Sequence, residues 1–195
     1  MRLGIFAGLL LGVLMLQASQ ALAQDTKWRL GLNYGVLSEK ELAYVKTDEG
    51  AAAGFEVGRK FGDKVELGLS YTYAEVKYKS TRLPIELGFD DHFFLLFGNF
   101  SLDGVLKGLY AGPQAGFVSR VLRKENDNIG LDSLAFGARV GYERLIAGGL
   151  SVGAQARFVS VGEAGKTVTD DNVKVKYSLD DTRFMTYLLS VNYRF

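Results

Sequence analysis

The chain has 195 residues, with 23 Lys and Arg against 22 Asp and Glu, so its formal net charge at pH 7 is +1. A protein this close to neutrality has no bulk attraction to nucleic acid, so we expect no nucleic-acid partner. The chain contains no cysteine, so its fold uses no disulfide bond.

The first residues have the three-part layout of a secretory signal peptide. One cation, Arg2, precedes an apolar run from Leu3 to about Leu16, and small residues then end in the sequence Ala-Leu-Ala. The apolar run is shorter than the ~20 residues that a spanning helix needs. We therefore expect a signal peptide over residues 1–23. The remainder, 24–195, is expected to be one domain, because no Pro/Ser-rich linker or charge block divides it.

From residue 28 onward, apolar side chains recur at every second position, which is the period of β-strands. Eight such runs follow one another, beginning at Trp28, Ala53, Val65, Phe93, Leu109, Leu134, Leu150 and Tyr187. The connections between them are predicted as short turns near 62–64, 101–107 and 147–149, and as long polar loops near 38–50, 75–90, 120–132 and 161–181. This alternation of short and long connections is typical of a membrane barrel, with tight periplasmic turns and longer outer loops.

Two segments depart from the simple pattern. The fourth run, FFLLFGNF (Phe93 to Phe100), is apolar at both odd and even positions, so periodicity does not decide which of its faces points outward. Pro113 lies inside the fifth run, where it removes a backbone donor from the hydrogen-bond ladder. We expect a bulge or a local break there.

The composition of the second face separates a membrane barrel from a soluble one, such as a secreted lipocalin-like binder. An outer surface in water is rich in Lys, Glu, Thr and Gln, whereas the alternate positions here are largely Gly, Ser, Ala and Asn. Such small residues fit the crowded interior of an eight-stranded barrel. The sequence therefore predicts an all-β fold, an eight-stranded antiparallel up-and-down transmembrane β-barrel whose apolar face meets lipid.

The last run, YLLSVNYRF, alternates up to the final residue of the chain. It resembles the C-terminal β-signal that the outer-membrane assembly machinery recognises, carried here by Leu189, Val191, Tyr193 and Phe195. With the signal peptide, the chain is similar to the small eight-stranded outer-membrane barrel superfamily, which includes the outer-membrane protein A transmembrane domain and its OmpX-like relatives. The resemblance covers about residues 26–195. It implies a monomer in the outer membrane of a Gram-negative bacterium, surrounded by lipid and lipopolysaccharide, with the assembly machinery as its partner during biogenesis.

Some barrels of this size are enzymes that act on lipid A, so a lipid A-modifying enzyme is one alternative. A lipid A deacylase of the known kind carries a His and a Ser two apart on one strand, but the residue two positions after His92 is Phe94. A lipid A palmitoyltransferase has an amphipathic helix before its first strand, for which residues 24–27 leave no room. Asp90, Asp91 and His92 share only residue types with omptin-like proteases. We predict no catalytic residue, no cofactor and no metal site.

Charged residues on the inward face require partners, because a buried charge without one is costly. Those near mid-barrel are Glu56, Arg139 and Arg157, with the uncharged but polar Gln155 beside them, and those nearer the short turns are Arg29, Glu66, Glu143 and Arg194. We predict that they form an ion-pair network that plugs a polar lumen. The sequence thus indicates a non-enzymatic outer-membrane protein with four extracellular loops, acting in envelope structure or surface interaction. A narrow small-solute channel is the other alternative.

Overall fold

The computed structural model describes residues 28–39, 45–80, 86–123, 129–170, 173–179 and 181–195. The predicted signal peptide lies outside these residues. Within the described part of the chain, no helix has the length and hydropathy needed to cross a membrane. Eleven β-strands are described there, and β-structure accounts for nearly all of this part.

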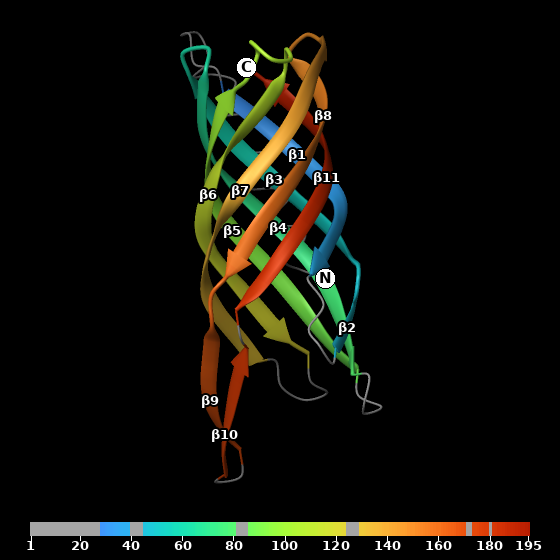
Figure 1. The fold of residues 1–195 in the computed structure, drawn as a ribbon, viewed down its shortest axis with the longest axis vertical. Coiled ribbons are helices and arrows are strands. Elements are labelled where there is room, and N and C mark those ends of the chain that lie inside the picture. Colours follow the sequence, from blue (N-terminus) through green and yellow to red (C-terminus); the bar gives the residue numbers. More distant parts are fainter. Residues whose placement is uncertain (1–27, 40–44, 81–85, 124–128, 171–172, 180) are drawn as a thin grey trace.

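Eight of these strands form a closed antiparallel barrel (Figure 1). Their order around the barrel is β1 (Trp28–Glu39), β3 (Gly50–Phe61), β4 (Val65–Ser80), β5 (Glu86–Ser101), β6 (Leu109–Leu122), β7 (Ile129–Ala147), β8 (Leu150–Val161) and β11 (Thr182–Arg194). Strand β11 then pairs with β1 and completes the circle. The predicted fold class is confirmed.

Closure of the barrel extends to the last residue of the chain. The β1–β11 ladder runs from Glu39 opposite Phe184 to Arg29 opposite Arg194. Beyond it, the Trp28 amide donates to the Phe195 carbonyl at 2.9 Å and the Phe195 amide donates to the Trp28 carbonyl at 3.0 Å. An open sheet in hydrocarbon would leave such groups unpaired at several kcal/mol each. The alternation up to the C-terminus therefore reflects strand pairing.

The short connections lie where the sequence predicts them, at the end of the barrel that holds the C-terminus (Figure 1). Gly62, Gly148 and Gly149 adopt positive φ angles of 63°, 54° and 86°, which L side chains rarely adopt. Between β5 and β6, the Gly108 amide donates to the Asp103 carboxylate at 2.7 Å. This bond holds the pKa of the Asp103 carboxyl below its ordinary value. We call this the short-turn end of the barrel.

At the opposite end, which we call the long-loop end, strands extend into segments that the sequence assigns to loops. Within the predicted 75–90 loop, for example, Lys77 pairs with Gly88. Strands β2 (Val45–Asp48), β9 (Ala164–Asp170) and β10 (Val173–Leu179) also lie in predicted loops, and β9 and β10 form a hairpin that projects beyond the barrel (Figure 1). The predicted loop boundaries are wrong because strands outside a bilayer do not need an apolar face, so alternation does not reveal them.

The structure determines which face of β5 points outward. Phe93, Leu95 and Phe97 are buried in the lumen, whereas Phe94 and Leu96 are exposed on the outer wall. The Phe93 ring packs edge to face against Phe184 on the opposite side of the lumen, with ring centroids 5.3 Å apart. The inward row of β5 is therefore apolar from Phe93 to Phe97, unlike the inward rows of small residues that the sequence shows on most other strands.

Pro113 interrupts one ladder without changing its register. In the β5–β6 ladder, Phe97 pairs with Gln114 and Phe100 pairs with Ala111, and the two intervening residues on each strand form no pairs. The β6–β7 ladder continues through Pro113. Since proline has no amide hydrogen to donate, the ladder opens on the side where that donor is needed. Of the two predicted outcomes, the structure shows a local break.

The outward row of β4 provides a test of which solvent the wall meets. Leu69 is 59% exposed and pairs with Val57 and Leu96, in the middle of the apolar band. If this wall faces hydrocarbon, Leu69→Arg lowers the free energy of unfolding in lipid vesicles by about 2–4 kcal/mol. Val105→Arg, in an exposed turn, makes the same charge change outside the band and should have little effect. Equal stability of both variants in urea titrations would contradict a lipid-facing wall.

Candidate functional site: the lumen

A charged network built around one carboxylate crosses the barrel interior. Glu56 on β3 is 1% exposed and accepts contacts from three guanidinium groups. Its carboxylate lies 2.9 Å from Arg29 Nη2 and 2.9 Å from Arg139 Nη2, and it also pairs with Arg157. Gln155 Nε2 donates to the same carboxylate at 3.4 Å. We call this group the Glu56 network; strands β1, β3, β7 and β8 contribute to it.

A second carboxylate extends this network toward the short-turn end. Arg29 donates through Nε to Glu66 at 2.7 Å and through Nη1 to Asn192 Oδ1 at 3.0 Å. The Arg29 side chain thereby links β1 to β4 and β11. A separate pair lies closer to the turns, where Arg194 Nη2 is 2.9 Å from Glu143, whose carboxylate also accepts the Ser151 hydroxyl.

Of the eight lumen residues that the sequence singles out, six lie in one connected group: Glu56, Glu66, Arg29, Arg139, Gln155 and Arg157. Glu143 and Arg194 bind each other instead. The six-residue group holds three guanidinium groups against two carboxylates, so it carries one excess positive charge. Arg157 also donates to Thr72 at 3.0 Å, a partner that sequence analysis did not identify.

Aromatic rings accommodate part of the excess charge. The guanidinium carbon of Arg139 lies 4.2 Å from the centroid of the Phe97 ring and 5.7 Å from that of Tyr110. A guanidinium over an aromatic face is attracted by the ring quadrupole, more strongly when it is desolvated. Phe97 was not predicted because the sequence does not show whether the odd-numbered or the even-numbered residues of β5 point inward. Once the odd-numbered residues are known to point inward, Phe97 must lie in the lumen.

Toward the long-loop end, the lumen contains an apolar layer. Its members are Leu37, Ala52, Ala74, Val76, Phe93, Leu95, Val118, Ala135, Val159, Val161, Phe184 and Leu188. Val118 and Phe184 are 0% exposed, and Leu95 and Leu188 are 2% exposed. The prediction of a polar lumen did not include this apolar layer. It overlooked Phe184 and Leu188, which occupy the inward row of β11, and it left the inward row of β5 unassigned.

A second charged group lies beyond the apolar layer. Arg120 Nε is 3.0 Å from Asp91 Oδ1, and Arg120 Nη2 is 3.6 Å from Glu39. The guanidinium carbon also lies 5.0 Å from the centroid of the Phe184 ring. This cluster was not predicted, because the sequence pattern places Glu39 and Arg120 in loops. The lumen thus alternates along its axis between charged and apolar layers.

His92 lies on the outer wall, away from both charged groups. Its Nδ1 is 2.9 Å from the Tyr71 hydroxyl, and its ring centroid lies 6.1 Å from that of Tyr71 and 5.3 Å from that of Tyr73. The neighbouring Asp91 points into the lumen and is 0% exposed, while Asp90 on the outer wall pairs with Arg123. No group of three His, Cys, Asp or Glu side chains that could hold a metal ion occurs within the described ranges.

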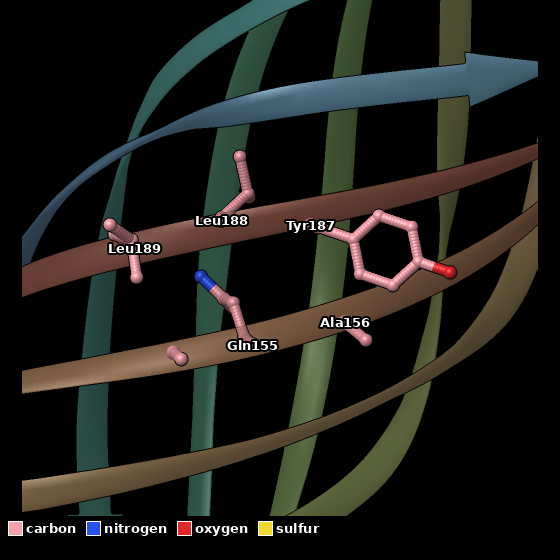
Figure 2. Close-up of a pocket in the computed structure, with 6 residues that line it drawn as sticks. Gln155, Ala156, Tyr187, Leu188 and Leu189 are labelled. Atoms are coloured by element: carbon pink, nitrogen blue, oxygen red, sulfur yellow. The ribbon is translucent and has the colours of Figure 1, made fainter.

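Two hollows in the described part of the barrel are large enough to hold a small ligand. The first is a depression of about 310 Å³ between β8 and β11 (Figure 2), lined by Ala154, Gln155, Ala156, Tyr187, Leu188 and Leu189. It offers no carboxylate, amine or imidazole and so no obvious chemistry. The second is a cavity of about 930 Å³ at the short-turn end, where Lys60, Glu66, Asn99 and Glu143 are among the lining residues.

The four residues of the predicted assembly signal lie at or near the outer wall of β11. Leu189, Val191 and Tyr193 form its outward row and are each at least half exposed. Phe195 follows the strand at the short-turn end, with its ring centroid 6.0 Å from that of Tyr193. The four side chains lie on the outside of the barrel, apart from the Glu56 network.

The sequence profile of the outer membrane protein beta-barrel domain matches residues 7–195. No curated protein sequence matches the chain. Several solved structures share the fold: Neisserial surface protein A (TM-score 0.55, 12% identity, 88% of this chain and 98% of that one), OprG from Pseudomonas aeruginosa (0.54, 12%, 87% and 95%) and a major outer membrane protein from Thermus thermophilus (0.53, 12%, 88% and 100%). At this identity the likeness concerns the fold alone.

The Glu56 network predicts unequal effects of removing its two kinds of charge. Glu56→Gln leaves three buried guanidinium groups with only the Glu66 carboxylate, and breaking a buried pair in this way typically costs about 3–5 kcal/mol. Arg139→Gln costs less, because Arg29 and Arg157 still neutralise Glu56. The double variant should lose less than the sum of the two single losses, since the residues are in direct contact.

Urea unfolding of the purified barrel in lipid vesicles measures these losses. Glu143→Gln serves as a control, because it removes the same charge from a carboxylate with a single arginine partner nearer solvent. It should destabilise the protein less than Glu56→Gln does. Additive effects of Glu56→Gln and Arg139→Gln would reject their coupling.

Proposed function

The chain belongs to the outer membrane protein beta-barrel domain family and lies in the bacterial outer membrane, and we propose that it acts there as a non-enzymatic barrel with a plugged lumen. In this proposal its role lies in the structure of the envelope or in interactions at the cell surface. The observation that carries the proposal is the succession of buried charged and apolar layers inside the barrel.

The apolar layer is a barrier to ions. An ion that crosses it must leave water without gaining a polar partner, and the free-energy cost of such desolvation is high. The side chains of Val118 and Phe184 are inaccessible to solvent, so the layer leaves no water-filled path beside them. The Glu56 network adds tightly paired charges on one side of the layer. Both features support a plug over a small-solute channel.

The outer wall supports a non-enzymatic role. His92 binds the hydroxyl of Tyr71 through Nδ1, and the residue that would carry a serine in the known deacylase arrangement is Phe94. Asp91 lies on the opposite side of the wall, so it is not placed to orient the His92 ring. Ser119 faces His92 across the β5–β6 ladder, and Asp90 lies on the same wall. Within the described residues, however, His92 is hydrogen-bonded to Tyr71 and not to Ser119, and the Asp90 carboxylate is held by Tyr73 and Arg123. His92 is therefore not engaged with a serine nucleophile in the way that a lipid A-modifying hydrolase requires.

The long-loop end is the part that we place at the cell surface, because outer-membrane barrels carry short turns on the periplasmic side. Strand β4 continues to Ser80, and the β9–β10 hairpin extends farther still (Figure 1). We propose that these extensions meet lipopolysaccharide and present the connecting segments above it. The chain needs no second subunit to close its sheet, which supports a monomer.

Conductance tests the plug. In planar bilayers the unmodified protein should show no steady current, whereas Phe184→Ser combined with Leu188→Ser should introduce water into the apolar layer and raise the current. Leu189→Ser makes the same kind of change on the outer wall and should leave the current unchanged. A stable open channel in the unmodified protein would instead favour the small-solute channel.

We further propose that Leu189, Val191, Tyr193 and Phe195 form the assembly signal read by the outer-membrane assembly machinery. Phe195→Ala keeps the backbone bonds to Trp28 but removes the terminal ring. It should lower the amount of folded protein in the outer membrane of cells, while refolding of purified chain into detergent proceeds normally.

Phe100→Ala provides the control for this experiment, because it removes an aromatic side chain that is half exposed on the short-turn side of the outer wall, outside the terminal run. Its level in the outer membrane should match that of the unmodified protein. Normal surface levels of the Phe195→Ala variant would reject the signal.

A further inference from the structure

The β9–β10 hairpin projects beyond the barrel as a sheet of its own (Figure 1). Within the described residues, β9 pairs with β10 alone. The root of the hairpin is anchored to β7, because the Gly162 amide donates to the Leu134 carbonyl at 3.0 Å. Strand β9 therefore runs away from the barrel, from Ala164 to Asp170. The outer edge of such a strand is a template for pairing with another strand.

The two edges of the hairpin differ in their charges. Strand β10, VKVKYSL, carries Lys174 and Lys176 and no acidic residue, and lysines on an edge strand oppose its pairing with another strand. Strand β9, AGKTVTD, carries one cation and one anion, Lys166 and Asp170, with Val168 midway between them. The edge of β9 is thus the one whose sequence suits pairing with a second copy of itself.

Two antiparallel β9 strands match each other when the pair is centred on Val168. In that register, Lys166 of each copy lies opposite Asp170 of the other, and Val168 lies opposite its own counterpart. Thr167 and Thr169 also lie opposite each other. Opposite charges, threonines and β-branched residues placed in this way across an antiparallel ladder stabilise it. The two-fold symmetry of the pair creates both charge pairs at once.

The register of the hairpin extends this match to four strands. Within one copy, Val168 pairs with Val175. Pairing about Val168 therefore aligns four valine positions in one row across the two hairpins. A hairpin of two strands is only marginally stable in water, whereas three or more strands with an apolar face form a stable sheet. A second copy would thus stabilise the projecting hairpin.

The direction of β9 determines where the second copy lies. Because β9 runs away from its own barrel, an antiparallel partner runs toward that barrel, and the barrel of the partner lies beyond the far end of the hairpin. Such a pair joins two membranes that face each other. Two copies in one membrane would align their β9 strands in parallel, which puts Lys166 opposite Lys166 and Asp170 opposite Asp170. Like charges in these positions are destabilising.

We propose that the outer edge of β9 binds a second copy of this chain whose barrel lies in a facing outer membrane. The interface is the antiparallel β9–β9 ladder centred on Val168, which is a form of strand addition at a sheet edge. Its consequence is contact between cells that carry the same protein. The inference rests on the proposed placement of the long-loop end at the cell surface and names the partner that this end meets. Each copy remains a monomer within its own membrane.

Docking of lipid vesicles tests the contact. Phosphatidylcholine vesicles that contain the refolded protein are labelled with a donor dye or an acceptor dye, and energy transfer between the two populations reports docking. Vesicles with the unmodified protein should dock. Lys166→Asp turns two pairs of opposite charges into two pairs of like charges, so it should slow docking about tenfold or more. Asp170→Lys should have the same effect. Absence of docking by the unmodified protein would overturn the proposal.

Exchange of the two charges gives a stricter test. Vesicles with Lys166→Asp and vesicles with Asp170→Lys should dock with each other although neither docks with itself, because each variant supplies the charges that the other lacks. The double variant with both changes should dock with itself again. If the mixed populations and the double variant fail to dock while the barrels are folded, the proposed register is wrong. Gel mobility before and after heating verifies that each barrel is folded.

Lys174→Asp is the matched control. It makes the same charge change as Lys166→Asp within the same hairpin, but on β10, away from the proposed interface. Docking should stay at the level of the unmodified protein. Equal losses from Lys166→Asp and Lys174→Asp would show that only the net charge of the hairpin matters and would overturn the proposal.

Intact cells separate this inference from the proposed surface placement. Cells with short lipopolysaccharide that express the unmodified protein should cluster, and cells that express Lys166→Asp should not. Thr167 is exposed and the chain has no cysteine, so Thr167→Cys reports the position of the hairpin through a membrane-impermeant maleimide. Labelling of this variant without clustering by the unmodified protein would reject the β9 contact alone. Absence of labelling would reject the surface placement and the contact with it.

Discussion

The structure depends on the rule that every backbone N–H and C=O group in hydrocarbon must find a partner within the protein. Eight antiparallel strands satisfy this rule only as a closed circle, and the two bonds between Trp28 and Phe195 show that the circle is complete to the chain end. Closure at this size also makes the interior narrow. Every inward side chain then lies close to others across the lumen, which explains why most of the buried inward charges pair with one another.

The interior uses two different kinds of packing. In the Glu56 network, stability comes from short contacts between opposite charges in a region of low polarity, where electrostatic interactions are strong and unpaired groups are costly. In the apolar layer, it comes from side chains such as Phe93 and Phe184 that exclude water. The second charged cluster, around Arg120, closes the apolar layer on its far side. Each charged group is thus shielded from water on at least one side by hydrocarbon side chains.

The barrel strands and their faces could be predicted from the sequence because lipid on one side and a crowded lumen on the other impose a strict period of two. The prediction was weaker where this contrast disappears. Phe93 to Phe97 is apolar on both faces, so the orientation of β5 needed the three-dimensional structure. Beyond the apolar band, water lies on the outside and alternation fades, so the strand extensions were taken for loops.

The site shows the same division. Glu56 and the charges around it were recognisable because an ionic side chain on an inward row has to be neutralised. Which residues on other strands pair with Glu56 depends on the register of the barrel, and alternation of apolar residues does not specify that register. Arg120 and Asp91 were missed because their strands had not been recognised as reaching that far. Phe184 and Leu188 were missed because an apolar inward residue does not stand out on a strand whose outward row is also apolar.

The contacts of Glu56 also make the complete barrel much more stable than a barrel with only some of its strands. Arg29 lies 27 residues away in sequence and arrives with the first hairpin, but Arg139 and Arg157 are 83 and 101 residues away and arrive with β7 and β8. A chain that has inserted only its first strands has one guanidinium group for this carboxylate, and its inward face is still open. The later strands bring further neutralisation and the covering wall together. Most of the stabilising free energy of these ion pairs is therefore gained cooperatively, when the last strands close the barrel. A partial barrel is an unfavourable species in the membrane.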